Sequence, residues 1–199
     1  MTTRPRVFVT RDIPEIALER LKLTCSVEQW RASESGTGPA AIPREQLLAG
    51  VENAEALFCL LTEKIDKPLL EAGPKLKVIG TMSVGYDHID VSECRKRGIL
   101  LGNTPDVLTE ATAELTVAIL LCTSRRLIEG NQQVKNGGWG TWSPLWMCGQ
   151  GLHGSTVGIL GCGRIGLSVA QKLIPFKPET IVYYNRKENQ GKCTGAFSE

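Results

Sequence analysis

Three closely spaced glycines in the second half of the chain could bind a phosphate group. Gly161, Gly163 and Gly166 lie between a strand-like run, Ser155–Leu160, and a helix-like run, Leu167–Ile174. Here Gly161 permits a tight turn, Gly163 lets the backbone approach a pyrophosphate, and Gly166 lets the helix pack close to the strand. The free N–H groups and positive dipole end of the helix start predict a dinucleotide site, against the alternative of a turn without a ligand. The predicted cofactor-binding residues of this turn are Gly161, Gly163, Arg164, Ile165 and Gly166.

The end of the next strand-like run, Thr180–Tyr184, bears on which dinucleotide would bind. An NAD enzyme usually carries Asp or Glu about 20 residues after the glycine turn, where the carboxylate accepts hydrogen bonds from the ribose. This chain has Asn185, Arg186 and Lys187 instead. Without the carboxylate a 2′-phosphate is not repelled, and Arg186 can pair with it. We therefore predict NADPH as the cofactor, with NADH weaker, and Arg186 and Lys187 as binding residues; a solvated basic turn is the alternative.

A second stretch that could hold an anion is Ser83-Val84-Gly85, between the strand-like Leu76–Gly80 and the helix-like Val91–Arg97. A glycine allows a ligand to approach the backbone closely, and successive N–H groups can form an anion-binding concavity. On the residues alone, a tight turn between strand and helix is equally consistent.

The chain offers little else for acid–base or metal chemistry. Its two histidines are His88, which we expect to pack beside a helix capped by Asp90, and His153, which we expect in a surface loop. None of the seven cysteines forms a C-x-x-C pair, so we predict reduced thiols and no metal site. No catalytic residue is predicted within these 199 residues.

The composition excludes several classes of partner. Net charge is +2 and the basic residues are dispersed, which argues against a nucleic-acid or anionic-membrane surface. The longest apolar run is too short for a membrane span of about 20 residues, and the charged Met1–Asp12 does not resemble a secretory signal. We expect a cytosolic protein.

Strand-like and helix-like segments alternate through the first half, which predicts an α/β fold with a doubly wound parallel sheet. We place a domain boundary near Pro105. Beyond it we expect a long helix over 107–126, a second helix ending at Lys135, and an irregular segment with three tryptophans over 139–151. The strand-like runs before the boundary are Val7–Thr10, Ser26–Trp30, Ala56–Leu61, Leu76–Gly80 and Ile99–Leu101, and the helix-like runs are Ile13–Leu23, Pro43–Gly50, Asp66–Ala72 and Val91–Arg97.

Several of these motifs together resemble the D-isomer-specific 2-hydroxyacid dehydrogenase family. The resemblance extends from about Arg6 to Arg186, and the tryptophan-rich stretch is closest to the glyoxylate/hydroxypyruvate reductase branch. It is carried by Thr81–Asp90, by Asn103–Thr109 through Glu114, by Asn136–Trp139 with Trp142–Gly149, and by the glycine turn.

The resemblance implies a flavodoxin-like substrate domain over residues 5–105, followed by an incomplete Rossmann dinucleotide-binding domain over 106–199. The latter would include a dimerisation helix and tryptophan loop over 107–151. In that family the backbone N–H groups of Ser83, Val84 and Gly85 would hold the carboxylate of a small 2-oxo acid. Trp142 would reach into the substrate site of the partner in a homodimer, although satellite core packing is the alternative from the residues alone.

The family supplies its catalytic Arg and His–Glu pair from a segment beyond this chain. The full-length relative would reduce glyoxylate or hydroxypyruvate with NADPH, whereas for the 199-residue chain we expect no turnover, weak NADPH binding and a marginally stable second half. We predict that residues 188–199 form a loop that follows the two strands of an incomplete Rossmann sheet. A non-catalytic dinucleotide-binding or corepressor-like protein, and an inactive product without cofactor affinity, are the competing interpretations.

Overall fold

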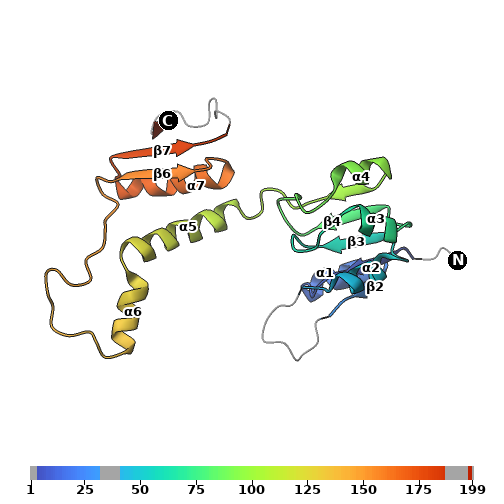
Figure 1. The fold of residues 1–199 in the computed structure, drawn as a ribbon, viewed down its shortest axis with the longest axis horizontal. Helices are drawn as coiled ribbons and strands as arrows, with labels where there is room; N and C mark the ends of the chain where they lie inside the picture. Colours follow the sequence, from blue (N-terminus) through green and yellow to red (C-terminus); the bar gives the residue numbers. More distant parts are fainter. Residues whose placement is uncertain (1–3, 32–40, 187–196, 199) are drawn as a thin grey trace. The chain divides into compact units, whose positions relative to one another are not determined.

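The structure, a computed structural model, describes residues 4–31, 41–186 and 197–198. It divides into two compact units, Met1–Asp106 and Val107–Glu199, and each is described by itself (Figure 1).

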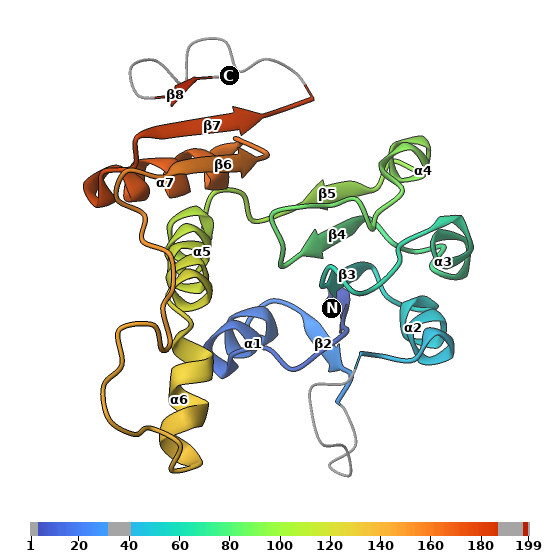
Figure 2. The ribbon, with the colours of Figure 1, turned by 60° about the vertical axis from the view of Figure 1, so that its left-hand side comes forward.

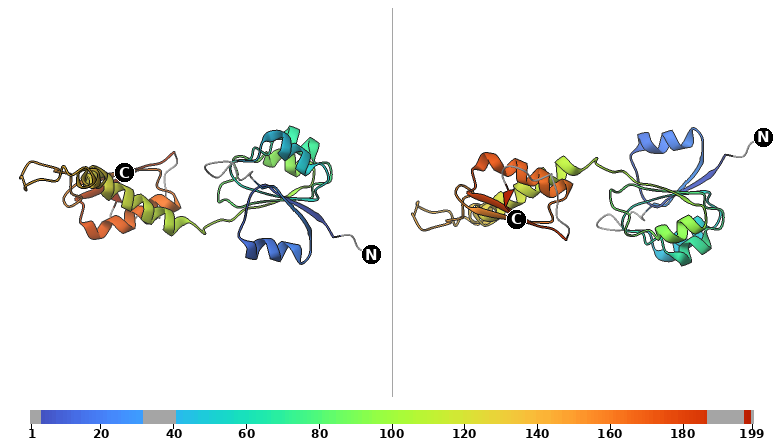
Figure 3. Two further views of the ribbon diagram at one scale, coloured as in Figure 1. Left: turned by 90° about the horizontal axis from the view of Figure 1, so that it is seen from below. Right: turned by 90° about the horizontal axis from the view of Figure 1, so that it is seen from above.

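The first unit is built on a five-stranded parallel sheet in the order β2-β1-β3-β4-β5 (Figure 2). Helix α1 covers one face of this sheet, and α2, α3 and α4 cover the other (Figure 3). The α/β character with a parallel sheet is therefore confirmed. Its strands are β1 (Arg6–Val9), β2 (Ser26–Gln29), β3 (Ala56–Cys59), β4 (Val78–Thr81) and β5 (Leu100–Gly102), and its helices are α1 (Glu15–Lys22), α2 (Arg44–Val51), α3 (Lys67–Ala72) and α4 (Val91–Lys96).

Local sequence signals explain where two of these helices begin. The carboxylate of Asp66 accepts the Leu69 N–H at 3.3 Å at the start of α3, and Asp90 accepts the Glu93 N–H at 2.9 Å at the start of α4. Each carboxylate satisfies a donor that has no partner within its helix. The predicted cap by Asp90 is thus observed. The core between the helices and the central strands includes Leu57, Ile65, Leu69, Leu70 and Ile79, all essentially buried.

The second unit contains α5 (Thr109–Ser124), α6 (Leu127–Lys135), β6 (Thr156–Leu160), α7 (Arg164–Leu173), a 3-10 turn (Ile174–Phe176), β7 (Thr180–Tyr184) and β8 (Phe197–Ser198). The expected helix over 107–126 is shorter than predicted, because Arg126 adopts a left-handed backbone with φ of 54° and separates α5 from α6. Among the described residues, no helix is both long enough and apolar enough to cross a membrane.

The sheet of this unit corrects the prediction of a two-stranded remnant with a loop-like tail. Its order is β6-β7-β8, and the short β8 pairs in parallel with β7, with Ile181 opposite Phe197. A strand of two residues carries no periodicity in the sequence, whereas the free edge of β7 offers unpaired backbone groups to it. The predicted loop 191–195 lies outside the described residues.

Close packing of α5 on α7 forms the core of the second unit. Ala113 and Ala170 are both fully buried, and such small side chains let two helices approach closely. At one end of this contact, Glu110 accepts hydrogen bonds from Ser168 at 2.8 Å and from Lys172 at 2.6 Å. The helix pair therefore supports one face of the β6–β7 sheet.

Candidate functional site

The loop that follows β4 has three successive carbonyl groups tied to neighbouring atoms. The Ser83 carbonyl accepts the backbone N–H of Thr104 at 2.9 Å, and the Val84 carbonyl accepts Nδ2 of Asn103 at 2.8 Å. The Gly85 carbonyl accepts the Ser83 hydroxyl at 2.7 Å. Each peptide plane of this loop is thus fixed in orientation before any ligand arrives.

Fixing the carbonyls also fixes the N–H groups, because the two point in opposite directions across a planar trans peptide. The N–H groups of Val84 and Gly85 therefore point away from the Asn103–Thr104 segment, and no acceptor for either is found among the described residues. A Cβ added to Gly85 would meet only the Asp87 carboxylate, at an ordinary 3.7 Å. The fold itself therefore does not require a glycine here, and its absent side chain leaves room beside two free donors.

Beneath this loop lie two buried hydroxyls and a partly buried imidazole. The Thr81 hydroxyl lies 2.7 Å from the Ser83 hydroxyl and 3.1 Å from Nε2 of His88. Burial lowers the pKa of His88, and the nearby carboxylates of Glu63 and Asp87 oppose that shift without reversing it. His88 is therefore neutral at pH 7. The sequence predicted only a packed histidine, whereas in the structure its Nε2 also lies within hydrogen-bonding distance of the Thr81 hydroxyl.

Glu63 is a buried carboxylate near the carboxyl ends of β1 and β3. It accepts hydrogen bonds from the Thr10 hydroxyl at 2.9 Å, the Leu60 N–H at 2.7 Å and the Arg11 guanidinium at 2.9 Å. Ligands of open parallel sheets bind outside the carboxyl ends of strands, where the strand order reverses. In this sheet the strand order reverses between β1 and β3, because β2 lies on the outer side of β1 and β4 on the outer side of β3. The ion pair between Arg11 and Glu63 therefore lies at the position where such folds bind ligands.

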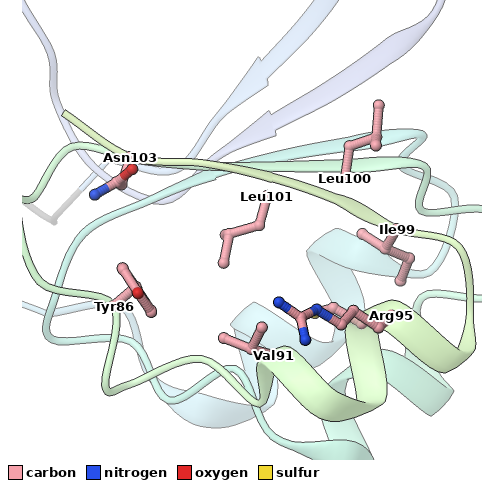
Figure 4. A pocket seen from close by; sticks show the side chains of 8 residues that line it. Tyr86, Val91, Arg95, Ile99, Leu100, Leu101 and Asn103 are labelled. Carbon is pink, nitrogen blue, oxygen red and sulfur yellow. The ribbon is translucent and has the colours of Figure 1, made fainter. Parts of the chain in front are cut away.

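A cavity of about 370 Å³ lies beside the same loop, between α4 and β5. Figure 4 shows Tyr86 and Arg95 on opposite sides of this space, with Val91 and Leu101 between them. Asn103, which holds the Val84 carbonyl, also lines the cavity. The loop is therefore flanked by a small, mostly apolar hollow.

In the second unit, the glycine turn joins β6 directly to α7. Gly161 has φ of 94°, in the left-handed region that favours glycine. A Cβ on Gly166 would overlap the Gly161 carbonyl oxygen and lie 3.1 Å from its carbon, so α7 packs against the turn closely enough to exclude any side chain. At Gly163, by contrast, a Cβ would meet nothing within 4 Å.

The start of α7 is open to a ligand. Gly163 is the N-cap and provides no side-chain acceptor for the first N–H groups of the helix. A helix start with a glycine as N-cap leaves room for a diphosphate near the positive end of the helix dipole. Arg164 and Ile165 occupy the first positions of α7, and their binding roles, like those of the three glycines, remain predictions.

The residues predicted to select the cofactor follow β7. Asn185 accepts the Cys162 N–H through Oδ1 at 2.7 Å, which ties the glycine turn to the end of β7. Arg186 is exposed to solvent at that end, and Lys187 lies outside the described residues. The bond made by Asn185 was not predicted, because nothing in the sequence distinguishes this amide from a surface side chain.

The tryptophan segment contains no helix or strand. Trp139 and Trp146 meet edge to face with ring centroids 4.7 Å apart, whereas Trp142 is 82% exposed. Trp142 is therefore not packed into the core of its own unit. A side chain that reaches into a partner subunit, as predicted for Trp142, must be exposed in this way. His153 is exposed, as expected of a surface loop.

Comparisons with known proteins identify the family. The profile of the D-isomer specific 2-hydroxyacid dehydrogenase, catalytic domain, matches residues 7–196. The chain belongs to this family. It is 52% identical over 186 residues to the human glyoxylate reductase/hydroxypyruvate reductase, covering 92% of this chain and 55% of that protein. It is 42% identical over 191 residues to the glyoxylate reductase of Pyrococcus horikoshii, with 94% and 55% covered.

Solved structures share the fold of this chain. A Thermus thermophilus protein superposes with a TM-score of 0.86 at 39% identity, covering 97% of this chain and 59% of that one. An NADPH-dependent glyoxylate/hydroxypyruvate reductase from Sinorhizobium meliloti, solved with NADP and malonate, superposes with a TM-score of 0.72 at 32% identity, covering 98% and 57%. The chain therefore spans about half the length of the curated relatives it matches.

Proposed function

We propose that the protein is an NADPH-dependent reductase of glyoxylate and hydroxypyruvate, giving glycolate and D-glycerate. The observation that carries this proposal is the loop with fixed carbonyls and outward N–H groups at Val84 and Gly85. Two free donors beside a glycine suit the carboxylate of a small 2-oxo acid, and donors that are already oriented need no reorganisation when it binds. Ser83, whose hydroxyl holds the Gly85 carbonyl, completes the substrate-binding loop.

The second unit would bind the dinucleotide, which supplies the hydride when bound. The turn at Gly161 and the open space at Gly163 would admit the pyrophosphate, and the start of α7 at Arg164 and Ile165 would donate N–H groups to it. Gly166 would keep the helix close enough to aim those groups. These residues thus fit a dinucleotide on their own geometry.

A preference for NADPH over NADH rests on the end of β7. Asn185 stands where an NAD enzyme usually has a carboxylate, and its Oδ1 is engaged with the Cys162 N–H. Arg186 is exposed at that end and can pair with a 2′-phosphate through charge-assisted hydrogen bonds. Lys187, also predicted to contribute, lies outside the described residues.

We assign the domains on the same basis. The order 2-1-3-4-5 of the first sheet is that of flavodoxin-like doubly wound folds, which supports a substrate domain over residues 5–105. The β6-α7-β7 unit with its glycine turn supports a Rossmann-type dinucleotide-binding domain, incomplete within residues 106–199. Free thiols throughout the described residues are compatible with the predicted cytosolic location.

A homodimer is proposed on the apolar surface of the second unit. Leu115 and Ile119 of α5, Ile128 of α6, and Trp142 and Leu145 of the tryptophan segment are all largely exposed. Where such side chains form one contiguous apolar patch, the patch marks a protein–protein contact. In such a dimer Trp142 would close the partner's substrate site. The relatives are reductases, which does not favour a corepressor-like role.

Two titrations of the 199-residue chain test the proposal. NADPH and NADH are added separately while nucleotide fluorescence is recorded, and we expect weak binding with NADPH the tighter ligand. Glyoxylate is then added to the 15N-labelled chain, and we expect the amide signals of Val84 and Gly85 to shift. The chain alone is expected to give no turnover with NADPH and glyoxylate. The assignment is refuted if neither nucleotide binds, or if glyoxylate leaves the loop amides unmoved.

A further inference from the structure

Beneath the substrate loop, the hydrogen bonds that join Gly85, Ser83, Thr81 and His88 can be arranged in only one direction if all three are made. The Ser83 hydroxyl has a single proton, and that proton is given to the Gly85 carbonyl, which can only accept. Toward Thr81, 2.7 Å away, Ser83 must therefore act as acceptor, so the Thr81 hydroxyl gives its own single proton to Ser83. Thr81 is then left to accept from Nε2 of His88 at 3.1 Å. The chain of donors starts at the imidazole.

We propose that His88 is a positioning residue whose Nε2–H group starts a one-way hydrogen-bond chain through Thr81 and Ser83 to the Gly85 carbonyl, holding the substrate loop in shape for a carboxylate. This inference rests on the proposed function, since it names what keeps the Val84 and Gly85 donors in place. His88 acts through other residues and does not itself touch the substrate.

Burial makes this arrangement strict. Thr81 and Ser83 are 3% and 7% exposed, so water does not replace a missing partner at these hydroxyls. In the other neutral tautomer, with the proton on Nδ1, Nε2 would be an acceptor and would draw the Thr81 proton to itself. Ser83 would still donate to the Gly85 carbonyl, but its oxygen would lie 2.7 Å from the Thr81 oxygen with no proton between them, and such a buried contact between two acceptors is costly.

The charged groups around His88 leave its donor role intact. The negative charges of Glu63 and Asp87 favour the charged form of the imidazole, whereas burial lowers its pKa and favours the neutral form more strongly. The Nε2–H group is present both in the required neutral tautomer and in the imidazolium. Protonation therefore preserves the chain, and only a change of tautomer breaks it.

The first measurement is the tautomer of His88 in the unmodified 15N-labelled chain without substrate. The protein has only two histidines, so His153→Gln assigns both imidazole spectra by elimination. Two-bond 1H–15N correlations distinguish a protonated ring nitrogen from an unprotonated one. We expect the proton on Nε2 of His88. If the proton is on Nδ1 alone, the proposed hydrogen-bond chain is overturned, whichever ligands the protein binds.

The second measurement compares variants in the glyoxylate titration. His88→Leu removes the donor, and we expect the dissociation constant to rise about five-fold, as for loss of one hydrogen bond. His88→Gln keeps a side-chain N–H in place of Nε2, and we expect a change of at most about two-fold. His153→Leu, a matched change at the exposed histidine, should leave binding as it was.

The outcomes separate the two proposals. Equal binding by His88→Leu and the unmodified chain, or an equal loss in His88→Gln, overturns the positioning role. If glyoxylate moves no loop amide in the unmodified chain, the proposed function fails and the positioning role fails with it, even with the expected tautomer. If His88→Leu does not fold, the tautomer measurement still decides the hydrogen-bond chain.

Discussion

Replacing Gly166 by alanine should loosen the second unit by a calculable amount. The new Cβ would overlap the Gly161 carbonyl oxygen and lie 3.2 Å from Cγ2 of Ile159. Overfilling a packed site costs about 1–3 kcal/mol. The colliding oxygen belongs to the backbone and cannot rotate away, so the cost falls toward the upper end. Alanine regains at most about 1 kcal/mol of helix propensity over glycine. We expect the free energy of unfolding of this unit to fall by roughly 2 kcal/mol.

Hydrogen exchange read by mass spectrometry can locate that loss. Peptides from β6 and α7 of Gly166→Ala should exchange faster, whereas peptides from the first unit should not change. The matched control is Gly158→Ala on β6, where the Cβ meets only Val182 at 3.9 Å and stability should hold. Unchanged or slower exchange of α7 in Gly166→Ala would mean that the helix does not approach the turn as closely as described, and the reasoning would fail.

Three further predictions concern the cofactor turn and α4. In Gly163→Ala the new Cβ meets no atom within 4 Å, so the free energy of unfolding should change by no more than about 1 kcal/mol. The affinity for NADPH should drop about tenfold, because the methyl group would occupy the space proposed for the pyrophosphate. Unchanged affinity would mean that the pyrophosphate binds elsewhere. Arg186→Gln should weaken NADPH about tenfold in fluorescence titrations and leave NADH unchanged, and an equal effect on both would dismiss the 2′-phosphate contact. The hydrogen bond from the Glu93 N–H lowers the pKa of Asp90 from its ordinary 3.8. The Asp90 carboxylate therefore contributes its full stabilisation above pH 3.8, and this stabilisation is lost as the pH falls through the lowered pKa. Asp90→Asn keeps the acceptor oxygen, and its denaturation curves between pH 2 and 5 should lack that pH-dependent component; curves matching the unmodified chain would argue against this cap.

Local signals were sufficient where one residue decides one backbone feature. The helix start at Asp90, the positive φ of Gly161 and the exclusion of a side chain at Gly166 all follow from short-range geometry that the sequence expresses directly. The parallel sheet could likewise be predicted, because apolar runs alternating with helices leave few other ways to bury both faces. The end of α5 and the pairing of β8 could not, since a left-handed Arg126 and a two-residue strand leave no pattern to detect.

By itself, the order of residues determined the positions of the two loops that are proposed to hold anions and the layers that present them. Only the tertiary structure decided how those loops are held. The pairing of neighbouring strands brings Asn103 to Val84 and Asn185 to Cys162, although these residues are 19 and 23 positions apart, and the turn of the loop after β4 brings His88 back to Thr81. A hydrogen bond depends on distance and direction in space, and neither quantity is written in residue types or their spacing.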